Sequence, residues 1–297
     1  LLPWDQLAFW AITICTGMLE YIPGIGIGLQ KMIRGGGEIG PATLSNFFAV
    51  HTAIIPACLV ILMPFHFWRV RKSKGLVIPR TPLEDPAIRG ETVATIPNLI
   101  IRELAVAAVL VALIMVVSVF FNAPLEAKAN PGLSPNPTKA PWYFAGLQEL
   151  LLHFHPLFAV LIIPAATVTG LFLLPYMRYD ADTAGVWFAS LRGRRTAIVA
   201  VVVALIITPP AIIADEFLFD FAAWLPGVPA VISNGLLPAV LVLAGIIGFY
   251  GLMKRYYAAN KNEAVQAVFV LLLIAFIILT STCIWFRGRG RALMWPG

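Results

Sequence analysis

The sequence predicts an all-α, polytopic transmembrane helical bundle with about six full spans. The first indication is composition: 60% of the 297 residues are hydrophobic, only 12% are charged, and the mean hydropathy is +0.86. A soluble globular chain carries about 25% charged residues. The second is that runs such as Val268–Ile278 are apolar on every side, which suits spanning helices and not the alternating strands of a membrane β-barrel.

A helix needs about 20 apolar residues to cross a bilayer. The stretches that meet this need are 47–68, 100–121, 157–177, 196–214, 235–253 and 264–286. Leu1–Met18 adds a partial N-terminal helix, which we interpret as the second half of a further span. This segment has neither a starting Met nor a charged leader, so it is not a signal peptide.

The third indication is where the basic residues lie. Of 21 Lys and Arg, 14 fall in Arg69–Arg102, Arg178–Arg195 and Lys254–Lys261. The positive-inside rule puts these regions on the cytoplasmic or equivalent (negative) side. It puts segments 18–45, 122–156 and 215–234 on the opposite, positive side. The three arginines after the last span, Arg287, Arg289 and Arg291, count against the rule. This alternation favours topology, and not nucleic-acid binding, as the reason for the net charge of +6.

The chain divides at a polar, Pro-containing loop. We expect residues 1–75 to form one domain, 76–98 a negative-side linker loop, and 99–297 a second domain. Within the second domain, a Pro-rich stretch at 124–141 precedes a short helical segment, Trp142–His153. The three cysteines lie in separate apolar segments without a C-x-x-C motif, so disulfides, zinc and c-type haem attachment have no support.

Two of the four histidines, His51 and His66, lie in one predicted span. Fifteen helical residues rise about 22 Å and turn about 60° beyond four full turns, so the two imidazoles share a broad face, one near each membrane surface. Imidazole is a common axial ligand of haem iron. Small neighbours, Ala49, Ala53 and Ala57, leave room for a flat macrocycle. Spacing alone leaves open that both are structural histidines hydrogen-bonded to adjacent helices.

Longer motifs resemble a known family. The segment Phe47–Pro56 around His51, with His66-Phe-Trp-Arg-Val-Arg71, resembles the fourth transmembrane helix of cytochrome b. Leu2-Pro-Trp-Asp-Gln6 resembles another family motif, and Pro141-Trp-Tyr-Phe144 resembles the quinol-site P-E-W-Y. The end of the chain, Trp285-Phe-Arg-Gly288 with Leu293-Met-Trp-Pro296, resembles the tail of subunit IV. The chain is thus similar to the cytochrome b of a quinol-oxidising Rieske/cytochrome b complex, nearest the plastoquinol–plastocyanin branch, with a fused subunit IV-like part. Span 196–260 matches least and adds two helices.

The resemblance implies two b haems. His51 would ligate the positive-side haem and His66 the negative-side haem, each paired with a histidine from helices preceding Leu1. Arg71 would bind a propionate, unless it is an ordinary flanking arginine. Asn46 stands where the family usually has a propionate-pairing arginine. A third, negative-side haem is left undecided.

The resemblance also implies quinol as substrate and a set of partners. These are a Rieske iron–sulfur protein, a c-type cytochrome, the missing N-terminal helices and a second copy, in an energy-transducing membrane such as a bacterial inner membrane. Trp142 and Tyr143 would line the quinol cleft, or else belong to an interfacial aromatic belt.

Pro141 occupies the position of the motif's glutamate. The carboxylate nearest to it along the segment is Glu149, about 12 Å further on if the segment is helical. Glu149 would take part in proton release if its pKa were tuned toward neutral, with His153 as a relay; the alternative is a solvated or helix-pairing residue. For His153 and His155 we expect a surface or interface role and not haem ligation.

Two other classes remain open from the residues alone. A two-haem membrane anchor of another quinone-linked dehydrogenase would share the histidine pair. A secondary transporter would share the spans, but it should show internal repeats, and none is evident.

Overall fold

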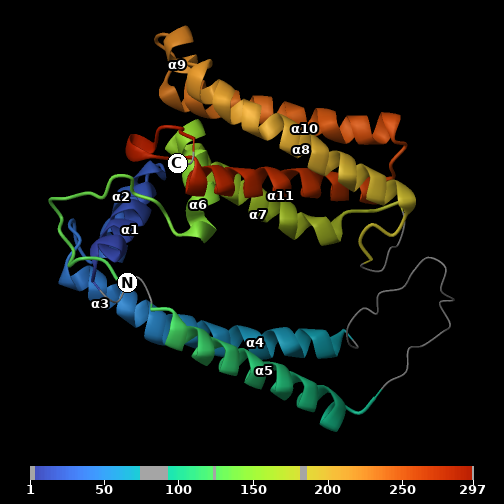
Figure 1. Ribbon diagram of the computed structural model, residues 1–297, viewed down its shortest axis with the longest axis horizontal. Coiled ribbons are helices and arrows are strands. Elements are labelled where there is room, and N and C mark those ends of the chain that lie inside the picture. The colour runs from blue at the N-terminus through green and yellow to red at the C-terminus, as the bar shows by residue number, and fades with distance from the viewer. Residues whose placement is uncertain (1–3, 74–92, 123–124, 181–185, 296–297) are drawn as a thin grey trace.

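The computed structural model describes residues 4–73, 93–122, 125–180 and 186–295 (Figure 1). Its α-helices are α1 Gln6–Gly17, α2 Gly26–Arg34, α3 Pro41–Ala49, α4 Ile55–Lys72, α5 Thr95–Phe120, α6 Trp142–His153, α7 Ile163–Leu173, α8 Leu191–Phe217, α9 Phe221–Trp224, α10 Leu237–Tyr256 and α11 Lys261–Trp285. Short 3₁₀ or π turns are η1 Met18–Tyr21, η2 Val50–Ile54, η3 Phe158–Ile162, η4 Leu174–Tyr176, η5 Ile232–Leu236 and η6 Arg289–Arg291. These described residues form only isolated β-bridges and no strand, which confirms the predicted all-α class.

Six helical segments are long and apolar enough to cross a membrane. They are Pro41–Lys72, Thr95–Phe120, Phe158–Tyr176, Leu191–Phe217, Ile232–Tyr256 and Lys261–Phe286. Each predicted apolar stretch falls on one of them, so the chain is an integral membrane protein. The partial N-terminal helix appears as the 12-residue α1. The predicted linker 76–98 lies mostly outside the described residues.

Prolines shape three of the spans in the same way. Pro56, Pro164 and Pro238 each follow a π turn by two residues. The residue before each proline donates its N–H to the carbonyl five residues back, as Ile55 does to Val50. Proline lacks an N–H and its ring crowds the carbonyl four residues back. A wider π turn moves that carbonyl aside, so each span continues through its proline.

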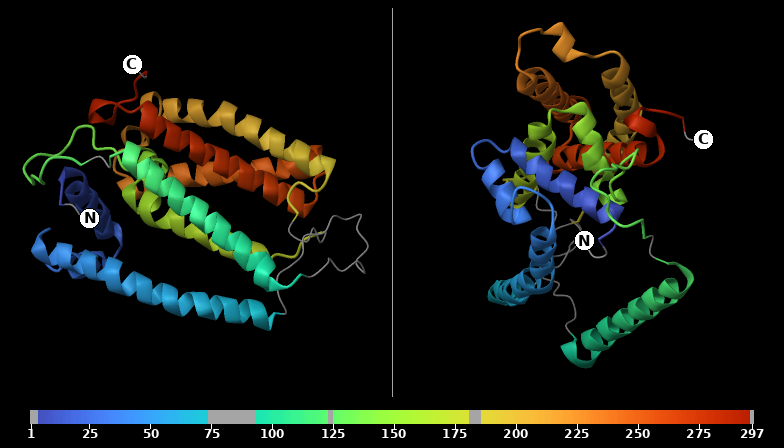
Figure 2. Two further views of the ribbon diagram at one scale, coloured as in Figure 1. Left: turned by 60° about the horizontal axis from the view of Figure 1, so that its bottom comes forward. Right: turned by 90° about the vertical axis from the view of Figure 1, so that its left-hand side faces the viewer.

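The core of the described chain lies in the C-terminal bundle, where α11 packs against α6, α8 and α10 (Figures 1 and 2). Its buried residues are mostly alanines, joined by Phe249 and Met253 of α10. Small residues let helix backbones approach closely in a membrane. Gly146 of α6 is the extreme case, because an added Cβ would lie 2.6 Å from Thr280 Oγ1 and 2.8 Å from the Phe276 ring. The bundle therefore depends on close packing between helices.

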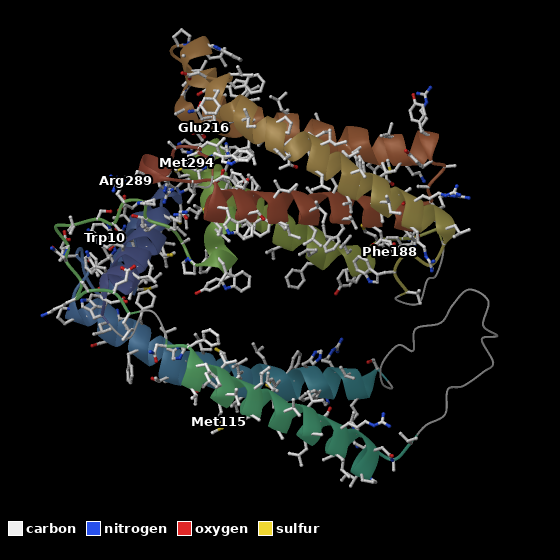
Figure 3. All side chains as sticks on the ribbon, viewed as in Figure 1. Trp10, Met115, Phe188, Glu216, Arg289 and Met294 are labelled. Atoms are coloured by element: carbon white, nitrogen blue, oxygen red, sulfur yellow. The ribbon has the colours of Figure 1, made fainter. Side chains whose placement is uncertain are left out.

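Helices α4 and α5 lie apart from this bundle (Figure 1). The described part of the chain buries none of their residues, and Met115 of α5 points away from the bundle (Figure 3). These apolar surfaces are left for lipid, cofactor or further protein to cover.

The connections that carry most of the basic residues gather at one end of the molecule. The end of α4, the start of α5, and the α7–α8 and α10–α11 connections all lie there (Figure 1). Two of these connections are bonded together: the Lys261 N–H donates to Asp180 at 2.6 Å and Arg192 donates to the Ala258 carbonyl at 2.6 Å. Figure 3 marks the two ends by Phe188 at the basic one and Glu216 and Arg289 at the other. This grouping fits the predicted topology, whose assignment to membrane sides stays a prediction.

Candidate haem helix and quinol segment

The candidate haem ligands lie on the long span Pro41–Lys72, His51 in the π turn η2 and His66 in α4. Both side chains are exposed. Among the described residues neither imidazole makes a hydrogen bond; His66 only lies beside Phe67, with ring centroids 5.9 Å apart. The alternative of two hydrogen-bonded structural histidines therefore finds no partner in the described part of the chain.

The π turn changes the angular relation between the two histidines. Fifteen residues of regular α-helix overshoot four turns by about 60°. A π turn spends more residues per turn, so η2 offsets part of this overshoot and brings the imidazoles nearer to one line. With Ala49, Ala53 and Ala57 beside His51, these residues would fit two haems, one held by each histidine.

The two residues considered for haem propionates differ in their surroundings. Asn46 donates from Nδ2 to the Ile33 carbonyl at 3.2 Å, so its side chain ties α3 to α2. Arg71 is exposed near the C-terminal end of α4. A propionate could reach Arg71, and the role of an ordinary flanking arginine is equally compatible with its position.

The candidate quinol segment begins α6. Trp142, Tyr143 and Phe144 are 71%, 57% and 50% exposed, so the described part of the chain does not fill the space beside them. Successive rings touch, with centroids 5.6 Å apart for the first pair and 4.9 Å for the second. This aromatic triplet, residues 142–144, offers an exposed apolar surface of tilted rings, suited either to a quinone ring or to a membrane interface.

The loop before α6 is fastened at both ends. Gln6 of α1 donates from Nε2 to the Leu133 carbonyl at 3.0 Å and accepts the Asn130 N–H at 2.8 Å. Gln148 of α6 donates to the Thr138 carbonyl at 2.9 Å and accepts the Ala140 N–H at 2.8 Å. The start of α6 is therefore tied to α1 through this loop.

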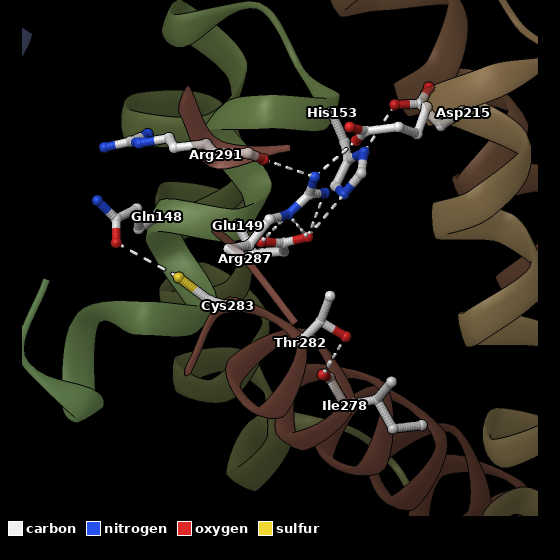
Figure 4. A network of polar contacts seen from close by, with 10 residues as sticks. Gln148, Glu149, His153, Asp215, Ile278, Thr282, Cys283, Arg287 and Arg291 are labelled. Carbon is white, nitrogen blue, oxygen red and sulfur yellow. Dashed lines mark hydrogen bonds and ion pairs between the residues drawn. The ribbon is translucent and has the colours of Figure 1, made fainter. Parts of the chain in front are cut away.

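Glu149 belongs to a group of five charged residues that we call the buried charge cluster: Glu149 and His153 of α6, Asp215 and Glu216 of α8, and Arg287 after α11 (Figure 4). The Arg287 guanidinium donates to Glu149 Oε1 at 2.7 Å and to Glu216 at 2.7 Å. The His153 ring places Nδ1 2.6 Å from Asp215 and Nε2 3.2 Å from Glu149. Glu149 has no exposed surface, so these contacts replace its hydration.

The electrostatics of the cluster oppose a titrating role for Glu149. Burial would raise the pKa of Glu149, but hydrogen bonds and charge from His153 and Arg287 outweigh it and lower that pKa. For His153, burial would lower the pKa, but hydrogen bonds to Asp215 and Glu149 raise it from 6.5 to about 9. Glu149 is thus held ionised and His153 protonated. The expected tuning of Glu149 toward neutral pKa is wrong in direction, because its cationic partners are so close.

The structure does not bring Glu149 together with the aromatic triplet. Glu149 lies on the buried face of α6 with Ala145 and Gly146, whereas Tyr143 is exposed. The alternative to proton release is a solvated or helix-pairing residue. Helix pairing describes the contacts of Glu149, and solvation does not.

The other two histidines both lie at contacts between elements. The His153 side chain is only 9% exposed, so of the expected surface or interface roles the interface role describes it. His155 donates its N–H to the Asn234 carbonyl at 2.7 Å and its ring meets Tyr21 edge-on, with centroids 6.0 Å apart. Both therefore have interface roles within the described chain.

The cluster also explains Arg287, one of the three arginines that broke the positive-inside pattern. Arg287 is 4% exposed and bound by two carboxylates, so it is no free flanking charge. Sequence reasoning missed Asp215, Glu216 and Arg287. The available signal was an acidic pair ending one span and an arginine following another on the same membrane side.

Comparison with known proteins agrees with the motifs. Residues 1–131 match the family model described as cytochrome b(N-terminal)/b6/petB. Cytochrome b6 of Desmonostoc sp. is 41% identical over 72 residues, which are 24% of this chain and 34% of that protein. Cytochrome b6 of Chlamydomonas reinhardtii is 42% identical over 72 residues, with the same coverage. The matched segment thus spans about a third of the length of these relatives.

A chain of a solved structure titled "Hyperthermophilic respiratory Complex III" shares the fold, with a TM-score of 0.54 and 21% identity, over 92% of this chain and 65% of that chain. The likeness to the cytochrome b family therefore lies in residues 1–131, and the solved structure adds a likeness of fold over most of the chain. More particularly, the matched 72-residue segment is similar to cytochrome b6, in agreement with the resemblance that the motifs carry.

Proposed function

We propose that this chain carries electrons from quinol across the membrane as the cytochrome b subunit of a quinol:cytochrome c-type oxidoreductase. The observation that carries the proposal is the pair His51 and His66, fifteen residues apart on one span and free of other hydrogen bonds among the described residues. Each imidazole would hold one b haem, and these haems would supply one-electron transfer between the two membrane surfaces. The second axial histidine of each would come from helices outside this sequence.

The aromatic triplet would bind the quinol ring near the positive side, with Trp142 and Tyr143 forming the apolar wall of the cleft. One electron would pass to a Rieske iron–sulfur partner and then to a c-type cytochrome, and the other toward His51 and His66. The two quinol protons would leave on the positive side. Arg71 would neutralise a propionate at the opposite surface. A homodimeric complex in an energy-transducing membrane, such as a bacterial inner membrane, fits this role.

Glu149 enters the proposal differently from the expectation. Because its carboxylate is ionised and bound by Arg287, it would support the quinol segment as a fixed charge and not as the group that titrates. Glu149→Gln keeps size and removes the charge. An unchanged pH profile of quinol oxidation in this variant would agree with a fixed-charge role, and a shifted profile would restore the proton acceptor.

The haem assignment is tested by replacing each histidine in the intact complex. His51→Ala and His66→Ala should each lose about half of the bound haem, because one axial ligand of one iron is gone. A reduced-minus-oxidised spectrum and a pyridine haemochrome count measure the loss. His155→Gln is the matched control and should retain both haems.

Full haem content in either alanine variant would reject the ligand assignment. Purification without an accompanying Rieske protein would favour a two-haem anchor of another dehydrogenase, and a complex without b-type absorption bands would favour a transporter.

A further inference from the structure

The hydrogen bonding of His153 requires its imidazole to be protonated. Each ring nitrogen faces a carboxylate oxygen, Asp215 at 2.6 Å and Glu149 at 3.2 Å. Neutral imidazole has a single N–H, so one nitrogen would turn a lone pair toward an anion. Only the imidazolium donates to both. The charge balance agrees, because the three carboxylates of the cluster would have Arg287 as their one cation if His153 were neutral.

The contacts of His153 join α6 and α8, two helices that also touch each other directly. The side chain comes from the last residue of α6, and Asp215 lies close to the end of α8. Both helices also pack on α11. Glu149 keeps Arg287 as a partner whatever the state of His153. Loss of the His153 proton removes the positive charge and one of the two N–H donors, and so weakens the tie that this side chain makes between α6 and α8, while Arg287 still joins Glu149 of α6 to Glu216 of α8.

We infer that protonated His153 is a positioning residue for the quinol segment: it fixes the end of α6 on α8 and thereby sets where the aromatic triplet at the other end of α6 presents its rings. This rests on the proposed quinol-binding role of Trp142 and Tyr143. A 12-residue helix transmits a change of tilt at one end to the other, because its backbone hydrogen bonds make it stiff. The helices with least resemblance to subunit IV would then act on the quinol segment through Asp215.

Every charged group around His153 bears on its proton. The charged groups around His153 are Glu149 on α6, Asp215 and Glu216 on α8, and Arg287 and Arg291 after α11. The carboxylates outnumber the arginine that they bind, and Arg291 turns its guanidinium to the Thr138 carbonyl at 3.4 Å. The raised pKa of about 9 keeps His153 charged at neutral pH and lets an alkaline titration release it.

The test compares a neutral and a permanently charged replacement in the purified complex. His153→Gln donates to one carboxylate without charge, and His153→Lys keeps a cation to higher pH. We expect His153→Gln to raise the quinol KM about 5-fold at pH 7 with kcat within about 2-fold, the signature of weakened binding. The wild-type KM should rise as pH passes about 9. His153→Lys should retain a near wild-type KM at pH 7 and delay that rise.

Further measurements separate positioning from general damage. Hydrogen exchange of residues 142–153 should quicken in His153→Gln, with both haem bands unchanged. Asp215→Asn keeps the shape of the acid and should shift KM in the same direction by a smaller factor. Asp220→Asn is the matched control, because Asp220 lies outside the cluster and caps α9 by accepting the Ala223 N–H, which Asn also does.

Equal KM values in wild type and His153→Gln, or identical pH profiles for the Gln and Lys variants, would overturn the inference. Faster hydrogen exchange of α6 with an unchanged quinol KM would reject the assignment of quinol to the aromatic triplet, and so the proposed quinol site. The haem content of the His51 and His66 variants would still test the proposed electron-transfer role independently.

Discussion

Two regions of the molecule, the span that carries His51 and His66 and the C-terminal bundle, differ in how the sequence determines their structure. In the first, the described chain buries no residue of α4, and the informative feature is the spacing of two side chains along one helix. In the second, α6, α8 and α11 bury a fully enclosed carboxylate among residues from three distant segments. Local spacing therefore describes the candidate haem helix, whereas the bundle depends on contacts between distant segments that form only on folding.

Removing one charge should lower the thermal stability more in the C-terminal bundle than in the span that carries His51 and His66. Arg287→Ala leaves Glu149 buried and uncompensated on its guanidinium side, which costs roughly 3–5 kcal/mol of stability. The thermal midpoint of the detergent-solubilised complex measures it. Arg289→Ala is the control, because that side chain is exposed, and its change should stay within about 0.5 kcal/mol. Equal thermal midpoints for the two variants would contradict the expectation that the bundle depends on its buried charges.

The distinction between local spacing and contacts of distant residues explains which features the sequence could predict. The six spans, α6 at Trp142–His153 and the resemblance to cytochrome b followed from apolar length and from motifs within short windows. The cluster did not, because no local pattern pairs Glu149 with a residue 138 positions away. The expected pKa direction of Glu149 was wrong for the same reason, since Arg287 and His153 decide it. The π turn at His51 was also missed, although Pro56 was its visible signal.

The thermal stability of the bundle should also depend on pH, through His153. Because the folded-state pKa of His153 is raised from 6.5 to about 9, its contribution to the free energy of unfolding is fully present below pH 6.5 and is lost as pH rises through about 9. The shift corresponds to roughly 3 kcal/mol. Thermal midpoints recorded from pH 6 to 10 should fall across that window. His153→Gln should lack this fall, and a parallel decline in both proteins would assign it to other groups.

Packing should give a smaller effect than charge. Gly146→Ala places a methyl group 2.6 Å from Thr280 Oγ1, and such overpacking costs about 1–3 kcal/mol. Gly170→Ala in α7 is the matched control, because its added methyl group meets no atom of the described chain within 4 Å. The thermal midpoint should fall for Gly146→Ala alone. A neutral Gly146→Ala would mean that α6 and α11 pack less closely than the bundle requires.

The smallest effect is expected at α1, where the N-terminal region meets the loop before the quinol segment. Asp5 caps α1 by accepting the Ala8 N–H at 2.8 Å, and its other oxygen accepts the Glu126 N–H at 3.2 Å. Asp5→Ala removes both acceptors and should cost about 1 kcal/mol, the usual value of an N-cap. The loss should be local, so hydrogen exchange should quicken for the first turn of α1 and for residues 126–130.

Asp5→Asn keeps one amide oxygen for the cap and should protect α1 while loosening the contact with Glu126. If Asp5→Ala instead lowered the thermal midpoint as much as Arg287→Ala, this junction would be as tightly coupled as the buried charge cluster. The contrast would then lie between α4 and the whole remainder of the chain, because α1, the loop and the bundle would unfold as one unit.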